Sequence, residues 1–202
     1  MGRAHFEHAD FLEAARRLAI EHGPAAVTVA SVTQHLGAPI GSFYHRFASR
    51  DVLLGELWLQ TVLDFQQGTT AALDAGDGLA AALHTPVWVR EHLEEGRLLL
   101  LYHRDDFVQG EWPQALRDRV AAQTERMTAG FARAARLIFG RVGPDELRRA
   151  QFLLAEVPVA AVRRHLERRE PPPPIVDELI RITYRAVVDD YRTRIRSGDA
   201  GE

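Results

Sequence analysis

The sequence predicts an all-α protein of about nine helices, with a small N-terminal helical domain followed by a larger helical domain. Apolar residues recur at helical spacing, glycines and prolines separate these stretches, and no strand alternation, hairpin pattern or internal repeat is evident. With 202 residues, 46% of them hydrophobic, the chain can bury a core in each of two parts. We place residues 1–50 in the first domain and residues 51–202 in the second.

Residues 28–54 hold the most informative pattern, which is two short helices joined by a glycine turn and then a longer helix. Thr28 can cap the first helix through its hydroxyl, and Gly37 can end it because glycine accepts the left-handed backbone of a tight turn. Pro39 suits the first turn of the second helix, which we expect from about residue 39 to 47. Two helices crossing through so short a turn form a helix-turn-helix, whose second helix enters the major groove of DNA.

The second helix of this pair has two different faces. Phe43 and Phe47 are spaced i and i+4, so they can anchor the helix to its domain. The other face is polar or bare and carries Gly41, Ser42, Tyr44, His45 and Arg46. A small helical subdomain with a merely solvated face is the alternative, but packing does not explain a tyrosine, a histidine and an arginine on an outer face.

Longer helices account for the rest of the chain. Ser49 can cap a helix that continues to about residue 73, with Asp51 in its first turn. Pro86 should kink the next one, Gly96 and Gly110 should act as breakers, and a proline run should form a stiff spacer before the final helix. The helices that we expect after residue 73 cover residues 79–95, 96–110, 112–139, 144–169 and 174–195.

Two segments together carry a family resemblance. The stretch GAPIGSFYHRFASRDVLL at 37–54 and the amphipathic helix FLEAARRLAIEHG ahead of it are similar to the N-terminal region of the TetR family of transcriptional repressors. The resemblance spans roughly residues 7–58. It departs from the family pattern at Ile40, where a basic residue is frequent, and at Pro39, where a capping serine is frequent.

The resemblance implies a role for each outward-facing residue. Thr28, Tyr44 and Arg50 would contact DNA phosphates. The residues facing the groove and its base edges would be Gly41, Ser42, His45 and Arg46. A good bidentate base contact contributes roughly 1–3 kcal/mol of discrimination, so a few side chains suffice for specificity.

Charge indicates that DNA contact is local and needs two copies of the domain. A formal net charge of −3 and a pI near 6.3 argue against a general nucleic-acid coat protein. Residues 1–50 hold five arginines against four acidic side chains, which leaves one net positive charge. Because affinity rises with the number of phosphates neutralised, a single module this weakly basic binds poorly and a symmetric pair is expected.

The final two helices carry apolar residues over a broad face. The resemblance implies that they pair with the same helices of a second subunit, giving a homodimer with a four-helix interface. The alternative is that they cap the core of a monomer. Dimerisation would set the spacing of the two reading helices near one turn of DNA.

The resemblance also implies a small-molecule site in the second domain, where an unidentified effector releases the protein from its operator. Ordinary core packing is the competing interpretation for each candidate, because an aromatic side chain at helical spacing is more often part of the core. The walls of a ligand pocket are apolar too, with only a few polar groups. The candidates are Trp58, Trp88, His92, Tyr102, His103, Phe107, Met127 and Phe131, with Phe65 and Phe152 as further possibilities.

Composition and motifs exclude several other classes. The chain has no cysteine, no apolar signal core and no apolar run long enough to span a membrane, so we expect a cytoplasmic protein. It has no repeated Glu-x-x-His, glycine-rich phosphate loop, His-Glu-x-x-His or Gly-x-Ser-x-Gly, so we expect no enzyme activity, catalytic residue, metal or cofactor.

The function that the sequence predicts is a DNA-binding repressor that binds a palindromic operator as a homodimer and is released by a ligand. A helical adaptor without sequence-specific DNA binding is the alternative. The arginine clusters at 163–170 and 191–196 are interpreted as solvated helix ends, where cations suit the negative helix terminus.

Overall fold

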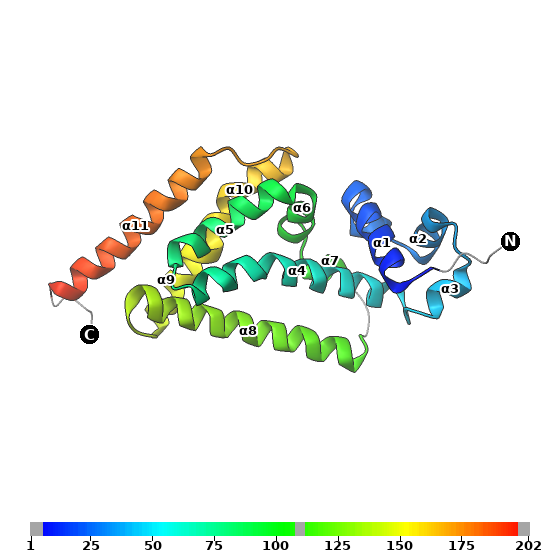
Figure 1. Cartoon of the computed structure of the whole chain (residues 1–202), viewed down its shortest axis with the longest axis horizontal. Coiled ribbons are helices and arrows are strands. Elements are labelled where there is room, and N and C mark those ends of the chain that lie inside the picture. The colour runs from blue at the N-terminus through cyan, green and yellow to red at the C-terminus, as the bar shows by residue number, and fades with distance from the viewer. Residues whose placement is uncertain (1–5, 108–111, 198–202) are drawn as a thin grey trace. The chain divides into compact units, whose positions relative to one another are not determined.

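The computed structural model describes residues 6–107 and 112–197, and the regular structure in these ranges is helical (Figure 1). Packing divides the chain into two compact units, residues 1–63 with 97–122 and residues 64–96 with 123–202. These units are defined by contacts within the chain and not by function. The predicted division after residue 50 therefore stays a prediction.

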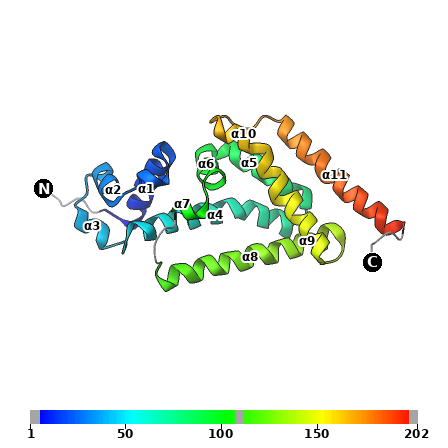
Figure 2. The ribbon, with the colours of Figure 1, turned by 180° about the vertical axis from the view of Figure 1, so that it is seen from behind.

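The first unit holds the N-terminal helices. α2 contacts both α1 and α3, and η1 contacts α1 and α7 (Figures 1 and 2). The unit also includes the beginning of α4, the end of α6 and the beginning of α8. The elements are α1 (His8–His22), η1 (Pro24–Ala26), α2 (Val29–Leu36), α3 (Ile40–Tyr44), α4 (Arg50–Asp74), α6 (Leu93–Leu101), α7 (Arg104–Phe107) and α8 (Gln114–Phe139).

Three phenylalanines form the centre of this unit. The ring of Phe11 on α1 meets Phe43 and Phe47 edge-on, with centroid distances of 5.9 and 6.2 Å. None of the three is more than 1% exposed. Each such aromatic pair contributes about 0.5–1.5 kcal/mol beyond the burial of its area. The predicted anchoring stripe of Phe43 and Phe47 is confirmed, and it fixes α3 against α1.

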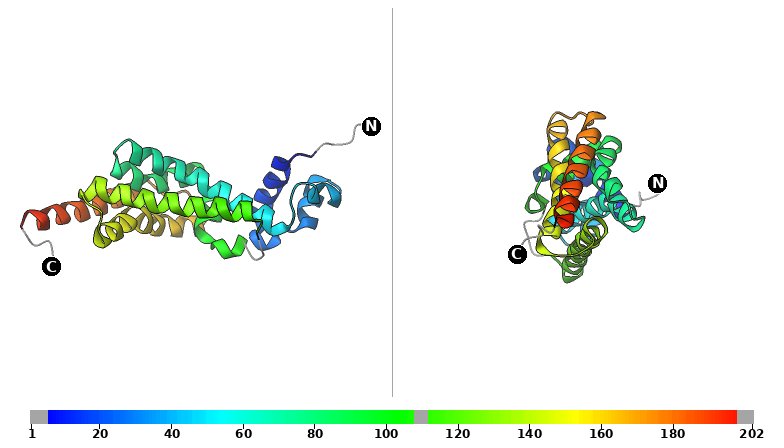
Figure 3. Two further views of the ribbon diagram at one scale, coloured as in Figure 1. Left: turned by 90° about the horizontal axis from the view of Figure 1, so that it is seen from below. Right: turned by 90° about the vertical axis from the view of Figure 1, so that its left-hand side faces the viewer.

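The second unit holds the later helices. α5, α10 and α11 contact one another, and Figure 3 shows α10 and α11 side by side. The parts of α4, α6 and α8 that the first unit does not take complete it. Its other elements are α5 (Gly78–Glu91), α9 (Pro144–Gln151), a π-helical segment (Phe152–Glu156), α10 (Val157–Glu167) and α11 (Ile175–Arg196).

The predicted helix over residues 96–110 is wrong in its bounds. α6 begins earlier, at Leu93, because His92 leaves helical geometry with φ −130° and ψ 54°. Gly96 is not a breaker but a buried packing position, where an added Cβ would lie 3.2 Å from Val89 and 3.4 Å from Leu166. The helix ends at Leu101 instead, and a short α7 follows. Gly110 lies outside the described residues.

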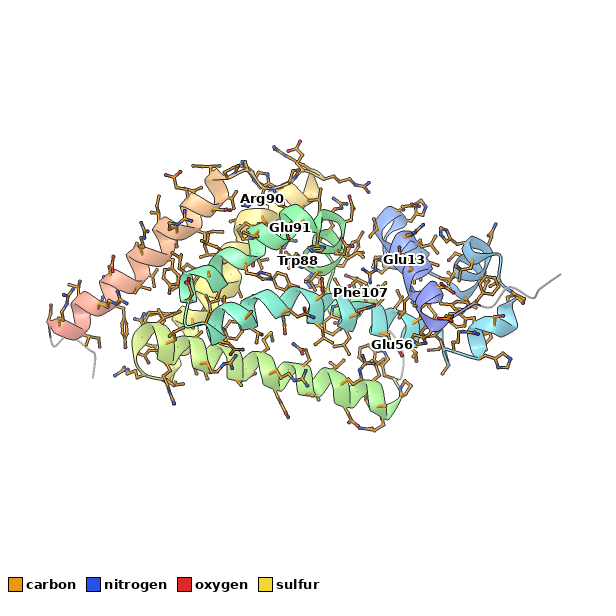
Figure 4. The ribbon with its side chains drawn as sticks, viewed as in Figure 1. Glu13, Glu56, Trp88, Arg90, Glu91 and Phe107 are labelled. Atoms are coloured by element: carbon orange, nitrogen blue, oxygen red, sulfur yellow. The ribbon has the colours of Figure 1, made fainter. Side chains whose placement is uncertain are left out.

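Charged side chains hold both ends of α11. Near its beginning, Arg90 of α5 (Figure 4) makes a bidentate ion pair with Asp177 and donates to the Pro172 carbonyl at 3.2 Å. Near its end, the Oη of Tyr191 and the Nε of Arg141 each donate to Oε1 of Glu146 at 2.9 Å. Bidentate and charge-assisted hydrogen bonds are the stronger ones in proteins, so they fix the position of α11 within the unit.

Glu146 is a buried carboxylate, since its side chain is 1% exposed. Burial acts to raise its pKa, but the hydrogen bonds from Tyr191 and Arg141 outweigh burial and hold the pKa below its ordinary value. A carboxylate with a lowered pKa in the folded state stabilises the fold at neutral pH. That contribution is lost as the pH falls through the pKa of the folded state.

We expect Glu146→Gln to lower the free energy of unfolding by about 1–3 kcal/mol at pH 7, because two hydrogen bonds to a charged acceptor are weakened. Urea unfolding at pH 7 measures this difference. Repeating it at successively lower pH should show the difference shrinking, because the wild-type carboxyl becomes neutral too.

Glu156→Gln is the matched control, since Glu156 pairs with Arg148 on the surface and both side chains are at least half exposed. Such a pair contributes little, about 0–1 kcal/mol. Equal stability of wild type and Glu146→Gln at pH 7, or a difference that stays constant with pH, would contradict the role given to Glu146.

Candidate nucleic-acid interface

The turn between α2 and α3 is built as the sequence predicts. The Ser31 amide donates to Oγ1 of Thr28 at 3.0 Å, and the Thr28 amide donates to Oγ of Ser31 at 2.8 Å, which makes a reciprocal cap at the start of α2. Gly37 ends α2 in the left-handed region, with φ 64°. The Ala38 amide then donates to the Thr33 carbonyl at 2.9 Å. These bonds set the angle at which α3 leaves α2.

α3 runs from Ile40 to Tyr44 and is therefore shorter than the predicted helix over residues 39–47. Pro39 is its N-cap, with extended geometry at ψ 142°, rather than its first helical residue. After the helix the chain stays tightly turned, since the amides of Arg46 and Phe47 both donate to the Phe43 carbonyl, at 2.8 and 2.9 Å. The buried side chains of Phe43 and Phe47 hold this short helix in place.

The outer face of α3 is open. Tyr44 is 58% exposed, and His45 is exposed as well. A Cβ added to Gly41 would meet no atom within 4 Å. Thr28 is exposed and Ser42 is half-buried. These five predicted DNA contacts therefore lie on or beside an accessible surface.

Arg46 lies along the surface of its own domain. Its Nη1 donates to the Ser42 carbonyl at 3.0 Å, and its guanidinium carbon lies 5.7 Å from the centroid of the Phe11 ring. A cation–π contact at an exposed site contributes about 0.5–1 kcal/mol. To reach a base edge, Arg46 would have to give up this cation–π contact and its hydrogen bond to the Ser42 carbonyl.

Arg50 has internal partners on three sides. Its Nε donates to the Val27 carbonyl, its Nη2 donates to the Pro24 carbonyl at 2.9 Å, and its Nη1 lies 3.1 Å from Oδ1 of Asp51. The start of α4 is thereby tied to the segment directly before Thr28. The resemblance implies a phosphate contact here, whereas the structure places the guanidinium on backbone carbonyls.

His8 is a further positioning residue that the sequence analysis missed. Its ring stacks on Phe47 at a centroid distance of 4.2 Å, and its Nε2 lies 2.8 Å from Oε2 of Glu56 (Figure 4). The start of α1 is thus linked to α4, and its contact with Phe47 lies in the segment that follows α3. No local pattern connects residues so far apart in the sequence, so periodicity could not have found this contact.

Four of the predicted effector contacts lie in the first unit. Phe107 (Figure 4) is 2% exposed and belongs to the core around Phe11, against which Trp58 and Tyr102 also pack. The rings of Tyr102 and Phe107 meet edge-on at 6.4 Å. His103 is exposed, and its amide donates to Asp106 at 2.7 Å. Core packing thus accounts for three of these residues.

The other four lie in the second unit. Trp88 (Figure 4) is 5% exposed, stacks on His92 at 4.9 Å and meets Phe65 edge-on at 5.1 Å. Met127 is 44% exposed, and Phe131 is half-buried. The structure therefore brings Trp88 and His92 into one aromatic cluster with Phe65.

Polar side chains that the sequence analysis did not single out include His84, whose ring lies 5.3 Å from the Phe65 ring, and the hydrogen-bonded pair Gln66 and Gln123. Burial lowers the pKa of His84, although the Phe65 carbonyl, 2.6 Å from its Nε2, acts in the opposite direction. Gln123 is 7% exposed and donates to Gln66, whose amide lies 3.8 Å from the Met127 sulfur. Gln66 itself is half-buried.

Within residues 6–107 and 112–197, no group of three or more histidine, aspartate and glutamate side chains is arranged to hold a metal ion. Of the helices in the same ranges, none combines the length and the apolar character needed to cross a membrane.

Comparison with known proteins points to one group. Residues 11–57 match the family model described as bacterial regulatory proteins, tetR family. No curated protein matches the chain in sequence. The match begins within α1 and covers η1, α2, α3 and the beginning of α4, which are the elements that build and support the exposed face described above.

Solved structures resemble the chain over most of its length. A Shewanella sp. PV-4 protein classed as a tetR family transcription regulator has a TM-score of 0.60 and 18% identity, with 91% of this chain and 96% of that chain covered. The ketosteroid transcriptional regulator KstR2 of Mycobacterium tuberculosis has a TM-score of 0.55 and 18% identity, with coverages of 93% and 95%. At these identities the likeness shows the fold, which is TetR-like, with a helix-turn-helix domain before a helical domain.

We expect Arg50→Met to lower the free energy of unfolding by about 1–2 kcal/mol, because two partly buried carbonyls lose a charged donor. Urea unfolding followed by circular dichroism measures the change. Arg17→Met is the matched control, since Arg17 is exposed and pairs with Glu13 one helical turn away, which contributes a few tenths of a kcal/mol. Equal unfolding midpoints for the two variants would show that the internal bonds of Arg50 do not stabilise the domain.

Proposed function

We propose that this chain is a transcriptional repressor that binds a palindromic operator as a homodimer, given its TetR-like fold and the tetR family match of residues 11–57. The single observation that carries the proposal is the exposed outer face of α3, held by the buried rings of Phe11, Phe43 and Phe47. A helix fixed on one side and bare on the other suits insertion into the major groove.

Each outward residue receives a role in this proposal. Thr28 and Tyr44 contact phosphates, which fix the register of the domain on DNA without reading sequence. The base-reading positions are Gly41, Ser42, His45 and Arg46. Arg50 acts mainly by positioning, because its bonds to the Val27 and Pro24 carbonyls hold the segment that presents Thr28.

Dimerisation is proposed from the exposed stripe of α11. Ile175, Leu179 and Ile182 follow helical spacing and are 50%, 56% and 56% exposed. A contiguous apolar surface of this kind marks an interaction site on a protein. We propose that α10 and α11 of two copies pack together about a two-fold axis. The two α3 helices would then face half-sites separated by one turn of DNA, roughly 34–36 Å, or by a multiple of it.

Effector release is the final element of the proposal. A ligand that binds the DNA-free conformation more tightly lowers DNA affinity by its differential affinity, commonly about 1–3 kcal/mol. The aromatic cluster of Trp88, His92 and Phe65, together with the buried amide of Gln123 and its partner Gln66, supports a recognition site in the second unit. The other predicted contacts, Trp58, Tyr102, His103, Phe107, Met127 and Phe131, are held as candidates for mutation in a binding assay.

A helical adaptor is the alternative function, because the α11 stripe could also receive another protein. Sequence-specific retention of DNA separates the two. An adaptor would show no preference among duplex sequences at moderate salt, whereas a repressor would select one.

We expect Tyr44→Ala and Arg46→Ala each to weaken operator binding by roughly 5- to 150-fold, because the first removes a hydrogen bond to a charged phosphate and the second a base contact, each of about 1–3 kcal/mol. The measurement is a gel shift or anisotropy titration with duplexes selected from a random library and from DNA flanking the gene, at several salt concentrations. Because the Tyr44 side chain is neutral, Tyr44→Ala should leave the slope of log affinity against log salt unchanged.

Arg17→Ala serves as the charge-matched control, since Arg17 is exposed on α1 and pairs with Glu13. It should keep the site preference of the wild type. The assignment of α3 as the reading helix fails if both α3 variants keep wild-type affinity and preference while Arg17→Ala behaves in the same way.

We expect Leu179→Glu to convert the dimer to a monomer, because it places a charge in the middle of the α11 stripe and the buried charge would lack a partner. Sedimentation velocity measures the oligomeric state, and operator affinity should fall with it. Arg192→Glu introduces the same side chain on α11 outside the stripe and should leave the dimer intact. A Leu179→Glu variant that stays dimeric would exclude this face as the interface.

A further inference from the structure

One side chain on the exposed part of α3 is aliphatic. Ile40 is the first residue of α3 and is 57% exposed. Among the described residues of the first unit, the large hydrophobic side chains that are exposed are Ile40 and Tyr44, both on α3. The phenol of Tyr44 gives it a polar end, but Ile40 has none. Contact with an apolar partner would therefore stabilise a complex by removing the Ile40 side chain from water, and in the described part of this unit no other exposed large side chain is purely aliphatic.

The position of Ile40 indicates what covers it. Base edges in the major groove are contacted by the N-terminal residues of a recognition helix, and Ile40 begins that helix. Beside it, a Cβ added to Gly41 would meet no atom within 4 Å, so the backbone next to Ile40 is open to an approaching duplex. A β-branched side chain in a helix has essentially one χ1 rotamer, so Ile40 loses little conformational freedom when it is covered.

We infer that Ile40 is a specificity-determining residue that recognises the 5-methyl group of a thymine in each half-site. Thymine is the base that presents a methyl group in the major groove, and the other base edges there present hydrogen-bonding groups that isoleucine cannot satisfy. The inference rests on the proposed function and adds to it one base preference, at the position opposite the start of α3. It also gives a role to Ile40, one of the two residues at which the sequence departs from the family pattern.

Replacing thymine with deoxyuridine tests this directly, because the exchange removes the methyl group and leaves base pairing unchanged. The wild-type protein first selects its site from a random duplex library. Each thymine of that site is then replaced with deoxyuridine in turn, and the dissociation constant is measured by fluorescence anisotropy at fixed salt. The same series is measured with Ile40→Ala and with Ile40→Val, which retains a β-branched side chain.

One thymine position should stand out. There the exchange should weaken wild-type binding about fourfold, or about fifteenfold when made in both half-sites, which is the effect of exposing one or two buried methyl groups. The exchange should have no effect at that position in Ile40→Ala and a clear effect in Ile40→Val. Because Ile40 is exposed, both variants should melt within a few degrees of the wild type.

The outcomes separate this inference from the function on which it rests. The inference is overturned if no exchange weakens wild-type binding, if the selected site has no thymine, or if Ile40→Ala shows the same penalty as the wild type. In each of these cases sequence-specific binding itself stands. If the wild-type protein selects no sequence at all, the proposed function fails and the inference fails with it.

Discussion

The packing of Phe11 against Phe43 and Phe47 is the interaction on which the candidate interface depends. α3 is a single short helix of five residues, and isolated helices of that length are not stable in water. Its conformation is therefore held by the burial of these rings and by the backbone bonds that follow Phe43. Because the apolar side of α3 is used entirely for this anchoring, its remaining side is left free to meet a partner.

Two polar connections extend this support beyond the aromatic core. Arg50 links the start of α4 to the carbonyls before Thr28, and His8 joins Phe47 to Glu56. Both connect segments that are distant in sequence and close to the exposed face. A reading surface that must match the groove of DNA benefits from such support, because small displacements of its side chains weaken several contacts together.

Exposed apolar side chains are distributed unevenly between the two units. In the described part of the first unit the large ones are confined to α3, whereas in the second some are scattered, such as Met127 and Leu137, and three follow one another along α11. Since each exposed aliphatic side chain is unfavourable in water, these two places are where the chain gains most from a partner. The small exposed face of α3 is suited to the proposed contacts with single bases. The longer stripe on α11 is suited to the proposed contact with a second helix.

Local sequence determined much of this protein. The caps at Thr28 and Ser49, the turn at Gly37, the i and i+4 spacing of Phe43 and Phe47, and the bounds of α4, α8 and α11 all follow from residues within a few positions of one another. The tertiary structure decided the rest: the break at His92, the use of Gly96 for close packing, the internal partners of Arg50, and the burial of Glu146 against Tyr191 and Arg141. These features depend on which distant segments meet, and a helical period fixes which face of a helix is apolar but not which neighbour covers it.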